Sequence, residues 1–534
     1  MGADPDRRSR ASRAIGRSPL VSGENEAEGG ELGLNEARQV ARAVERAREA
    51  GRTRWVAFVV DARVGLRFEH SLRCYASAGK RDRFLWNRSE SGDFSVCWGV
   101  ADEIESAGVG RFRDVRAWSE EIRARIDWIG DARPATAATF FGGFGFEAES
   151  RGSAEWKAFP AARFFLPEVI TESREGRTRG VFIARVEPSS SVESVVSDLR
   201  ARRAELQRIG RCGVASDREA FSETEAPESV AQDPTSLDDW PAGPEYRVRA
   251  DRSHGIFCAQ VRTALDAFTG GELSKVVLAR SLSIDHDDAL DVSAFLGRLH
   301  VLYPTCTLIA MGRGEDTFLA ATPETLIRVS DGAVETTALA GSAPRGRHPE
   351  EDRTLAERLL SSSKERSEHA HVVEAIRGVL EGACGSLEIP EVPALRPLLG
   401  IQHLETPIRG RLKSGMESEA ESDALTLVEA LHPTPAVGGA PRAAAEDFLH
   451  RFERLDRGWY AAPIGWLDSQ GGGDFSVALR SGLIRNGIAE PGRSGASRAL
   501  LFAGAGIVEG SDPEEELIET RIKLRALLAP LTEI

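Results

Sequence analysis

A strand, a glycine-rich stretch and a helix follow one another close to the C-terminus, and this order limits the folds open to the chain. Residues 499–502 predict a short strand, Gly504, Gly506 and Gly510 predict a turn, and the residues after them predict a helix. A dinucleotide-binding fold can begin in this way. Only about 24 residues follow Gly510, however, and they cannot supply the second strand and the ribose-binding carboxylate of that fold. We therefore expect another architecture.

Charged side chains on the predicted C-terminal helix suggest a binding site. Glu516, Glu519 and Lys523 are three and four residues apart, so they share one helical face near the backbone N–H groups of the predicted turn. Such a face could hold a cation and an anion together. Charges at this spacing more commonly form a solvated surface with a salt bridge, and this segment alone does not distinguish the two.

A second predicted helix, at 364–380, repeats the pattern with Glu365 and Glu368. Four carboxylates in two pairs suit a hard divalent cation such as Mg²⁺, which prefers oxygen ligands and keeps several waters. One direct ligand from each helix would suffice if the other carboxylate of each pair supported it. We assign Glu368 and Glu519 as the direct ligands and Glu365 and Glu516 as their supports.

Charge and cysteine usage exclude several classes of function. The 534 residues carry a formal net charge of −15, whereas nucleic-acid binding depends on clustered Lys and Arg, so no nucleic-acid partner is expected. No apolar run is long enough to span a membrane. The six cysteines contain no C-x-x-C pair and follow no secretory signal. These features predict a soluble, cytoplasmic protein with reduced thiols and no membrane contact.

Composition divides the chain into four parts. Residues 1–32 are rich in Arg, Ser, Gly and Glu without a hydrophobic period, and they predict a disordered tail. Residues 213–247 are acidic and poor in large apolar side chains, which predicts a linker. The linker separates an N-terminal part, 33–212, from a C-terminal part, 248–534, which holds both acidic helices.

Several elements can be predicted within these parts from hydrophobic periodicity. The N-terminal part should contain a helix from Leu34, strands at 54–60 and 180–186, and a helix at 192–209. Residues 273–282 predict a strand with Lys275, Val277 and Ala279 on one face. A lysine on a strand often protects an exposed edge. A catalytic lysine would instead need burial or a nearby cation to lose its proton near neutral pH.

Nine sequence blocks occur together in an order that is typical of one family. They are SKVVLAR (274–280), ATPETL (321–326), TALAGSAPRG (337–346), KERSEH (364–369), QHLET (402–406), LHPTPAVGG (431–439), GWLD (465–468), VALR (477–480) and the C-terminal block (502–523). In these blocks the chain resembles the chorismate-utilising enzymes, and among them the isochorismate synthases. A weaker likeness, in FLW (84–86) and FFGGFGF (140–146), extends over the N-terminal part.

The resemblance implies an α+β fold of large antiparallel sheets packed face to face with helices outside, which forms a single large catalytic unit. Residues 248–534 would be its chorismate-binding catalytic domain. Lys275 would activate the water that attacks C2 of chorismate, and Glu324 would protonate the departing C4 hydroxyl. As an acid, Glu324 needs a raised pKa, although a Pro-Glu pair alone more often opens a turn or a helix. The two side chains should face each other across a cavity.

The resemblance also implies how the two carboxylates of chorismate are held. Arg480, at the end of a strand predicted at 475–480, would bind one of them through its guanidinium group. Mg²⁺ on Glu368 and Glu519 would hold the ring carboxylate. The other residues expected to contact the substrate are Gly504, Ala505, Gly506, Lys523, His432, Ala340 and Gly341. His432 would line the ring pocket, although a single histidine is more often a core residue.

Single residues within the blocks separate the branches of the family. Lys275 replaces the glutamine of the anthranilate-forming enzymes, which favours water over ammonia and predicts that no glutaminase subunit is needed. Ala340 replaces the covalent lysine of the aminodeoxychorismate synthases. Salicylate synthases share Lys275 and stay an alternative, as does an inactive homologue that only binds chorismate. The expectation is a monomeric, Mg²⁺-dependent isochorismate synthase of menaquinone or siderophore biosynthesis.

Overall fold

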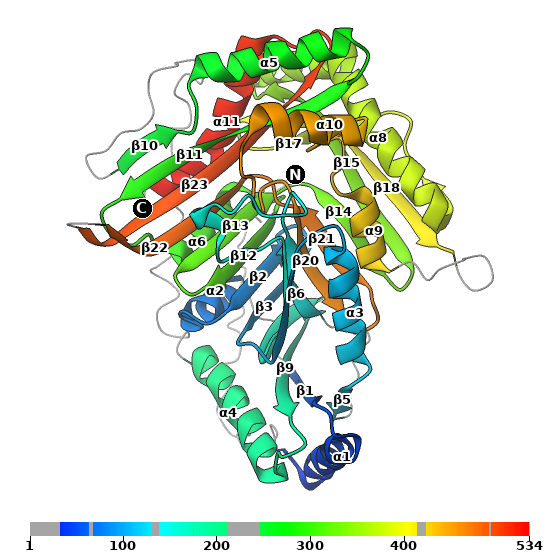
Figure 1. The fold of residues 1–534 in the computed structure, drawn as a ribbon, viewed down its shortest axis with the longest axis vertical. Coiled ribbons are helices and arrows are strands. Elements are labelled where there is room, and N and C mark those ends of the chain that lie inside the picture. The colour runs from blue at the N-terminus through cyan, green and yellow to red at the C-terminus, as the bar shows by residue number, and fades with distance from the viewer. Residues whose placement is uncertain are drawn as a thin grey trace, which may run out of the picture.

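Two large β-sheets pack face to face, with helices on their outer faces (Figure 1). The computed structural model describes residues 32–62, 68–130, 138–174, 176–211, 246–413, 423–490 and 493–532. The predicted class, α+β with stacked antiparallel sheets, is confirmed. The predicted tail at 1–32 lies outside the described residues except for Leu32. The predicted linker at 213–247 also lies outside them except for Tyr246 and Arg247, which begin a strand.

The first sheet has thirteen strands in the described part of the chain. Their spatial order is β10 (Tyr246–Ala250), β11 (Lys275–His286), β23 (Arg493–Val508), β22 (Ser481–Glu490), β13 (Asp316–Thr322), β12 (Thr307–Arg313), β2 (Arg83–Arg88), β3 (Asp93–Trp98), β8 (Val169–Arg174), β9 (Arg177–Val186), β1 (Arg54–Ala62) and β5 (Ile126–Ile129). The short β19 (Gly439–Ala440) also pairs with β11. Strands β1 and β5 are parallel, and the other described pairs in this sheet are antiparallel.

The second sheet has ten strands among the described residues. Their order is β16 (Cys384–Glu388), β18 (Ile401–Leu412), β15 (Ala333–Pro344), β14 (Thr325–Ser330), β21 (Gly473–Val477), β20 (Pro463–Asp468), β6 (Ala138–Phe144), β7 (Ala162–Leu166) and β4 (Asp102–Ser106), and β17 (Ala394–Pro397) pairs with β18. Strand β6 pairs with β20 here, as β2 pairs with β12 in the first sheet. Each sheet therefore consists of a block of N-terminal strands and a block of C-terminal strands, which are joined through one strand pair.

Helices cover the outer faces of the sheets (Figure 1). The first sheet carries α1 (Leu34–Ala50), α2 (Phe68–Ser77), α4 (Val192–Arg211), α6 (Val292–Leu302) and α11 (Pro513–Thr532), with α5 (His254–Thr269) beside α11. The second sheet carries α3 (Arg111–Arg123), α8 (Ser363–Ala383) and α9 (Ala424–Leu431). The remaining helical segments are α7 (Pro349–Ser361), α10 (Arg442–Phe448), a 3₁₀ turn (Ala154–Trp156) and a π-helical turn (Leu449–Glu453).

The predicted helix starts at Leu34 and Val192 coincide with those of α1 and α4, and the predicted strands at 54–60 and 180–186 lie within β1 and β9. None of the helices in the described ranges combines the length and apolar character needed to cross a membrane.

Strand alternation lets the first sheet bury both of its faces. In β1, Trp55 and Ala57 belong to the core between the sheets, whereas Val56 and Phe58 belong to the core beneath the helices. Both sets are apolar, so the strand is continuously apolar from Trp55 to Val60 instead of alternating with polar residues.

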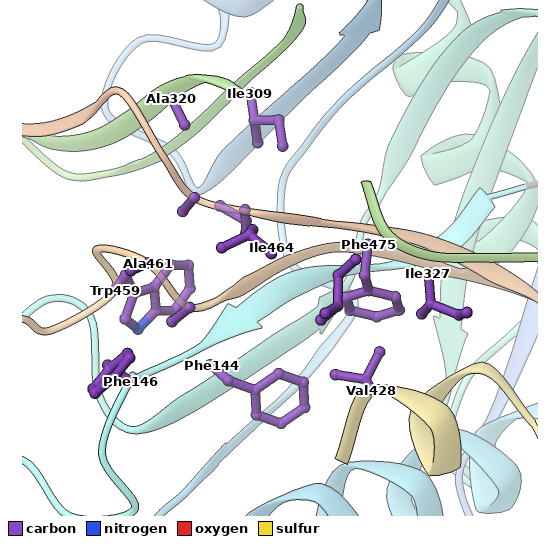
Figure 2. Close-up of a cluster of buried hydrophobic side chains, with 14 of the residues drawn as sticks. Phe144, Phe146, Ile309, Ala320, Ile327, Val428, Trp459, Ala461, Ile464 and Phe475 are labelled. Atoms are coloured by element: carbon purple, nitrogen blue, oxygen red, sulfur yellow. The ribbon is translucent and has the colours of Figure 1, made fainter. Parts of the chain in front are cut away.

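Figure 2 shows the two layers of core around the second sheet. Ile309 of the first sheet lies opposite Ile464 of β20. Phe144 and Phe475 point to the other side, toward Val428 of α9. This packing fixes the separation of the two sheets, and with it the distance between side chains that project from one sheet and from the other.

Candidate active site

A cavity of about 710 Å³, its open mouth included, lies where strands of both sheets meet helices α8 and α11. Its walls comprise Val277, Pro323, Glu324, Leu339, Ala340, Gly341, Ser342, Glu368, His403, Ala436, Val437, Tyr460, Leu479, Arg480, Phe502, Ala503, Gly504, Gly506, Glu519 and Lys523. Most of the sequence blocks named above contribute to this set. The fold thus brings together segments that lie far apart in the sequence.

Lys275 lies inside the first sheet and not at its edge. Its backbone pairs with Val508 of β23 on one side and with Ala440 of β19 on the other. The side chain is fully buried, and its Nζ lies 3.0 Å from Oε1 of Glu368. Protection of a sheet edge, the other explanation considered for this lysine, is therefore excluded.

Glu324 precedes β14 and lines the cavity with only 3% of its surface exposed. Burial raises the pKa of its carboxyl group to about 8, although Lys275 and Lys523 act in the opposite direction. The carboxyl therefore holds a proton near neutral pH and is close enough to both lysines to interact with them. This is the property that a general acid at this position requires.

The two acidic helices meet at the cavity. Helix α8 begins after Ser362, whose hydroxyl accepts the backbone N–H of Glu365, and α11 begins with Pro513; both are favourable helix starts. Lys364 of α8 donates to Oε1 of Glu516 of α11 at 2.8 Å. This contact joins the N-terminal ends of the two helices. The same ammonium group also lies 3.4 Å from Glu365 of its own helix.

The four carboxylates interact with one another. Burial, and then the charge of Glu368, raises the pKa of Glu365. Burial and the charge of Glu519 raise the pKa of Glu516 to about 7. Close carboxylates repel when all are ionised, so a cation placed among them would be stabilised.

The side chains fit Mg²⁺ in chemical type, since all four offer hard oxygen donors. Within the described ranges, no three His, Cys, Asp or Glu side chains form a ready-made ligand group. A cation held by one carboxylate from each helix, with its other positions open, is compatible with this arrangement. Lys275 and Lys523 are ion-paired with Glu368 and Glu519, the two carboxylates assigned as direct ligands.

Arg480 lies in the segment after β21, which ends at Val477, so the strand predicted through residue 480 ends earlier than expected. Its backbone has φ 44°, a left-handed conformation that is uncommon for arginine. Nη2 lies 3.2 Å from Nε2 of His403, and Nε and Nη1 have no hydrogen-bond partner among the described residues. A buried guanidinium group with two unused nitrogens on a cavity wall suits a carboxylate.

His403 orients this guanidinium group. Its Nδ1 lies 3.0 Å from Oγ of Ser342, and its pKa is lowered well below the usual value by burial and by the charge of Arg480. A neutral imidazole that donates to Ser342 can accept the Arg480 N–H at Nε2.

The glycines expected to form a turn are part of a strand. Gly504, Ala505 and Gly506 lie within β23 and pair with Ala279, Leu278 and Val277 of β11. Side-chain alternation directs Ala505 away from the cavity. Of these three residues, only Gly504 and Gly506 line it. A Cβ on Gly504 would come within 3.0 Å of the Tyr460 hydroxyl. Glycine at this position therefore relieves a tight contact within a strand and does not serve a turn.

The other predicted contact residues divide into two groups. Ala340 and Gly341 line the cavity, and Nζ of Lys523 donates to the Gly504 carbonyl at 2.9 Å and to Glu519 at 2.7 Å. His432 is not among the lining residues, contrary to expectation. It is 7% exposed, lies 3.1 Å from the Phe146 carbonyl oxygen, and has a pKa lowered to about 3, chiefly by burial. It belongs to the core.

The lining residues that were not predicted include His403, Tyr460 and Phe502. The QHLET block contains His403 and could have indicated it. Tyr460 and Phe502 stack with ring centroids 5.2 Å apart. Their sequence context does not separate them from other apolar residues of the core.

Comparisons with known proteins identify the family of this chain. The family described as chorismate binding enzyme matches residues 42–532. The chain belongs to the chorismate-binding enzymes. Among curated members, the salicylate biosynthesis isochorismate synthase of Pseudomonas aeruginosa is 35% identical over 453 residues, which is 84% of each chain. Isochorismate synthase MenF of Bacillus subtilis is 36% identical over 458 residues, 84% of this chain and 88% of the relative.

A solved chorismate-binding enzyme has the same fold. The structure of MenF, the menaquinone-specific isochorismate synthase from Escherichia coli, superposes with a TM-score of 0.66 at 23% sequence identity. The match covers 92% of this chain and 100% of that one. At this identity the likeness concerns the fold, so the chemistry of the site depends on the residues described above.

Proposed function

We propose that the protein is an isochorismate synthase that converts chorismate to isochorismate. The observation that carries the proposal is the buried Lys275, paired with Glu368 of the cavity wall, beside Glu324, whose pKa burial raises to about 8. The two curated relatives, each matched over 84% of this chain, are isochorismate synthases by name.

The reaction exchanges one hydroxyl position for another. Lys275, as the neutral amine, takes a proton from the water that attacks C2, the ring double bond shifts, and Glu324 donates its proton to the C4 hydroxyl, which leaves as water. One water enters and one leaves, so substrate and product are isomers. An acid and a base in these roles each contribute about 10²- to 10⁴-fold to the rate.

Cationic groups bind and orient the substrate. Arg480 offers two guanidinium nitrogens without protein partners in the described structure, and Lys523 supplies an ammonium group beside Gly504. Glu365, Glu368, Glu516 and Glu519 would hold Mg²⁺, which would supply positive charge for a substrate carboxylate. Five of the cysteines, Cys74, Cys97, Cys258, Cys306 and Cys384, are buried free thiols, which suits a reducing cytoplasm.

One incubation tests the proposal. The purified protein is mixed with chorismate and Mg²⁺, and the products are separated by chromatography. Isochorismate as the released product supports the proposal. Salicylate with pyruvate, anthranilate when ammonia is supplied, or the absence of turnover would each contradict it.

A further inference from the structure

Strand β11, which carries Lys275, is paired with other strands along only part of its length on one side. Strand β23 pairs with it over its whole length, from Lys275 to His286. On the opposite side, β19 pairs only with residues 275–276, and β10 pairs only with residues 282–286. The backbone of residues 277–281 therefore needs other partners, because it lies inside the protein.

Two buried side chains complete this gap. The N–H of Ala279 donates to Oε2 of Glu453 at 2.7 Å, and the carbonyl of Val277 accepts from Nη2 of Arg457 at 2.7 Å. The gap is closed at its ends by Gly438, which accepts the Val277 N–H, and by Asp251, which exchanges hydrogen bonds with Ser281. Glu453 and Arg457 thus take the place of a missing strand.

Two parallel hydrogen bonds join Arg457 to Glu453, and both side chains are almost completely buried. Nε of Arg457 donates to Oε1 of Glu453 at 2.7 Å and Nη2 donates to Oε2 at 2.6 Å, and each side chain is 2% exposed. Glu453 is the last residue of the π-helical turn, and the next residue, Arg454, has φ 56°. The chain then leads to Arg457, four residues after Glu453. The guanidinium group also lies 4.3 Å from the centre of the Phe146 ring.

A third hydrogen bond ties the pair to the cavity wall. Nη1 of Arg457 donates to the carbonyl of Val437 at 2.8 Å. Val277 and Val437 both line the cavity, and Lys275 lies two residues from Val277 on the same strand. One guanidinium group therefore fixes the distance between the lysine-bearing strand and the wall segment that faces it.

Stability alone explains such a pair poorly. Burying two charges costs several kcal/mol per ion, and apolar residues of similar volume are often as stable or more so. The pair provides something that apolar residues cannot, namely directional hydrogen bonds to backbone groups on two walls of the cavity. We propose that Glu453 and Arg457 are a positioning pair that holds Lys275 and the Val437 wall in register for the isomerisation, an inference that rests on the proposed function.

The main test uses Arg457→Lys, which keeps the charge but loses the fork of donors. Because an error of about 1 Å in the position of a catalytic group can cost about 10²-fold, kcat for isochorismate formation should fall by about 10- to 100-fold. KM should change by less than about threefold, since Arg480 and Lys523 are unaltered. Hydrogen exchange of the peptide that contains residues 275–281 should become faster.

A second variant, Glu453→Met with Arg457→Met, removes both charges and leaves none unpaired. Because the N–H of Ala279 and the carbonyls of Val277 and Val437 lose their partners, it should melt below wild type, and its kcat should fall. The matched control is Glu172→Gln, which breaks another buried ion pair, with Arg179, at the opposite end of the same sheet. That variant should keep the wild-type kcat and the wild-type exchange of residues 275–281, whatever its melting temperature.

The outcomes separate the two proposals. Wild-type protein without isochorismate production contradicts the proposed function, and the exchange of residues 275–281 in Arg457→Lys still tests the positioning pair. If wild type is active and both Arg457→Lys and the double variant keep kcat within twofold and unchanged exchange, the positioning role is wrong. A double variant that does not fold leaves the decision to Arg457→Lys.

Discussion

The carboxylate of Glu368 lies directly against the backbone of Gly506. A Cβ at position 506 would come within 2.1 Å of Oε1 of Glu368 and 3.4 Å of Cε of Lys275. The first distance is too short for any real contact, so one of the two groups would have to move. The absence of a side chain on β23 therefore makes room for the ion pair between Lys275 and Glu368.

Gly506→Ala should inactivate the enzyme without unfolding it. Displacing Glu368 by about 1 Å is expected to cost about 10²-fold in kcat, and Mg²⁺ binding measured by calorimetry should weaken as well. Gly255→Ala is the control, because a Cβ there meets nothing within 4 Å. Wild-type activity in Gly506→Ala would show that Glu368 has another acceptable position.

Lys275→Ala and Glu324→Gln should each lower isochorismate formation by about 10²- to 10⁴-fold, the contribution of a positioned base or acid. The two groups act in one displacement, so either loss should stall the reaction. Steady-state rates and thermal melts of both variants check this. A folded Lys275→Ala variant with normal turnover would end the assignment of the lysine as the base.

Titration of Glu324 should make stability depend on pH. Its folded-state pKa is raised to about 8 from an ordinary value of 4.5, so the folded protein holds a proton that the unfolded chain releases between these values. Stability is thus fully present below about pH 4.5 and is lost as pH rises toward 8. Glu324→Gln lacks this term, so its melting temperature should rise relative to wild type between pH 5 and 8. A constant difference across that range would contradict the shift.

Mg²⁺ should be required for turnover, and excess EDTA should abolish it. Glu365→Gln and Glu516→Gln, as supporting groups, should weaken Mg²⁺ binding by about 10- to 100-fold, whereas Glu368→Gln and Glu519→Gln should weaken it further. Calorimetry with Mg²⁺ alone measures this order. Glu374→Gln is the control on the same helix, since its side chain is 72% exposed. Full activity in EDTA would contradict the metal assignment.

Arg480→Lys should raise KM for chorismate by about 10-fold or more, because hydrogen bonds to charged groups contribute about 1.5–3 kcal/mol and lysine lacks the planar fork. The control is Arg485→Lys. Arg485 lies on β22 and pairs with Asp316 of β13, so this change should leave KM unaltered. Initial rates over a range of chorismate concentrations compare the two. An unchanged KM in Arg480→Lys would mean that this guanidinium group does not hold the substrate.

Local patterns predicted much of the fold. Helix α1 follows directly from its hydrophobic period, and strand β1 from a short continuous run of β-branched and aromatic residues. The motif blocks likewise predicted that the carboxylates of α8 and α11 would be neighbours. That contact depends on tertiary structure, and only the family resemblance made it predictable.

The errors have physical causes. Gly504 and Gly506 were expected in a turn because glycine commonly supplies positive φ there. In β23 they instead provide space beside Glu368 and Tyr460, which depends on side chains distant in sequence. His432 was assigned to the ring pocket from the family resemblance, and His403 was not considered, because a sequence does not reveal which imidazole faces a cavity. Burial and hydrogen-bond partners decide that, and both are set by the assembled sheets.

The pairing of an early strand with a late strand in each sheet has a consequence for biosynthesis. Strand β2 pairs with β12, whose first residue is made about 220 residues later, a delay of about 10 to 40 s at ordinary translation rates. During that interval the aromatic residues Phe84 and Trp86 lack the strand that covers one side of β2. Expression of this protein should therefore depend on chaperone supply and growth temperature, and residues 32–211 should not form a stable fragment by themselves.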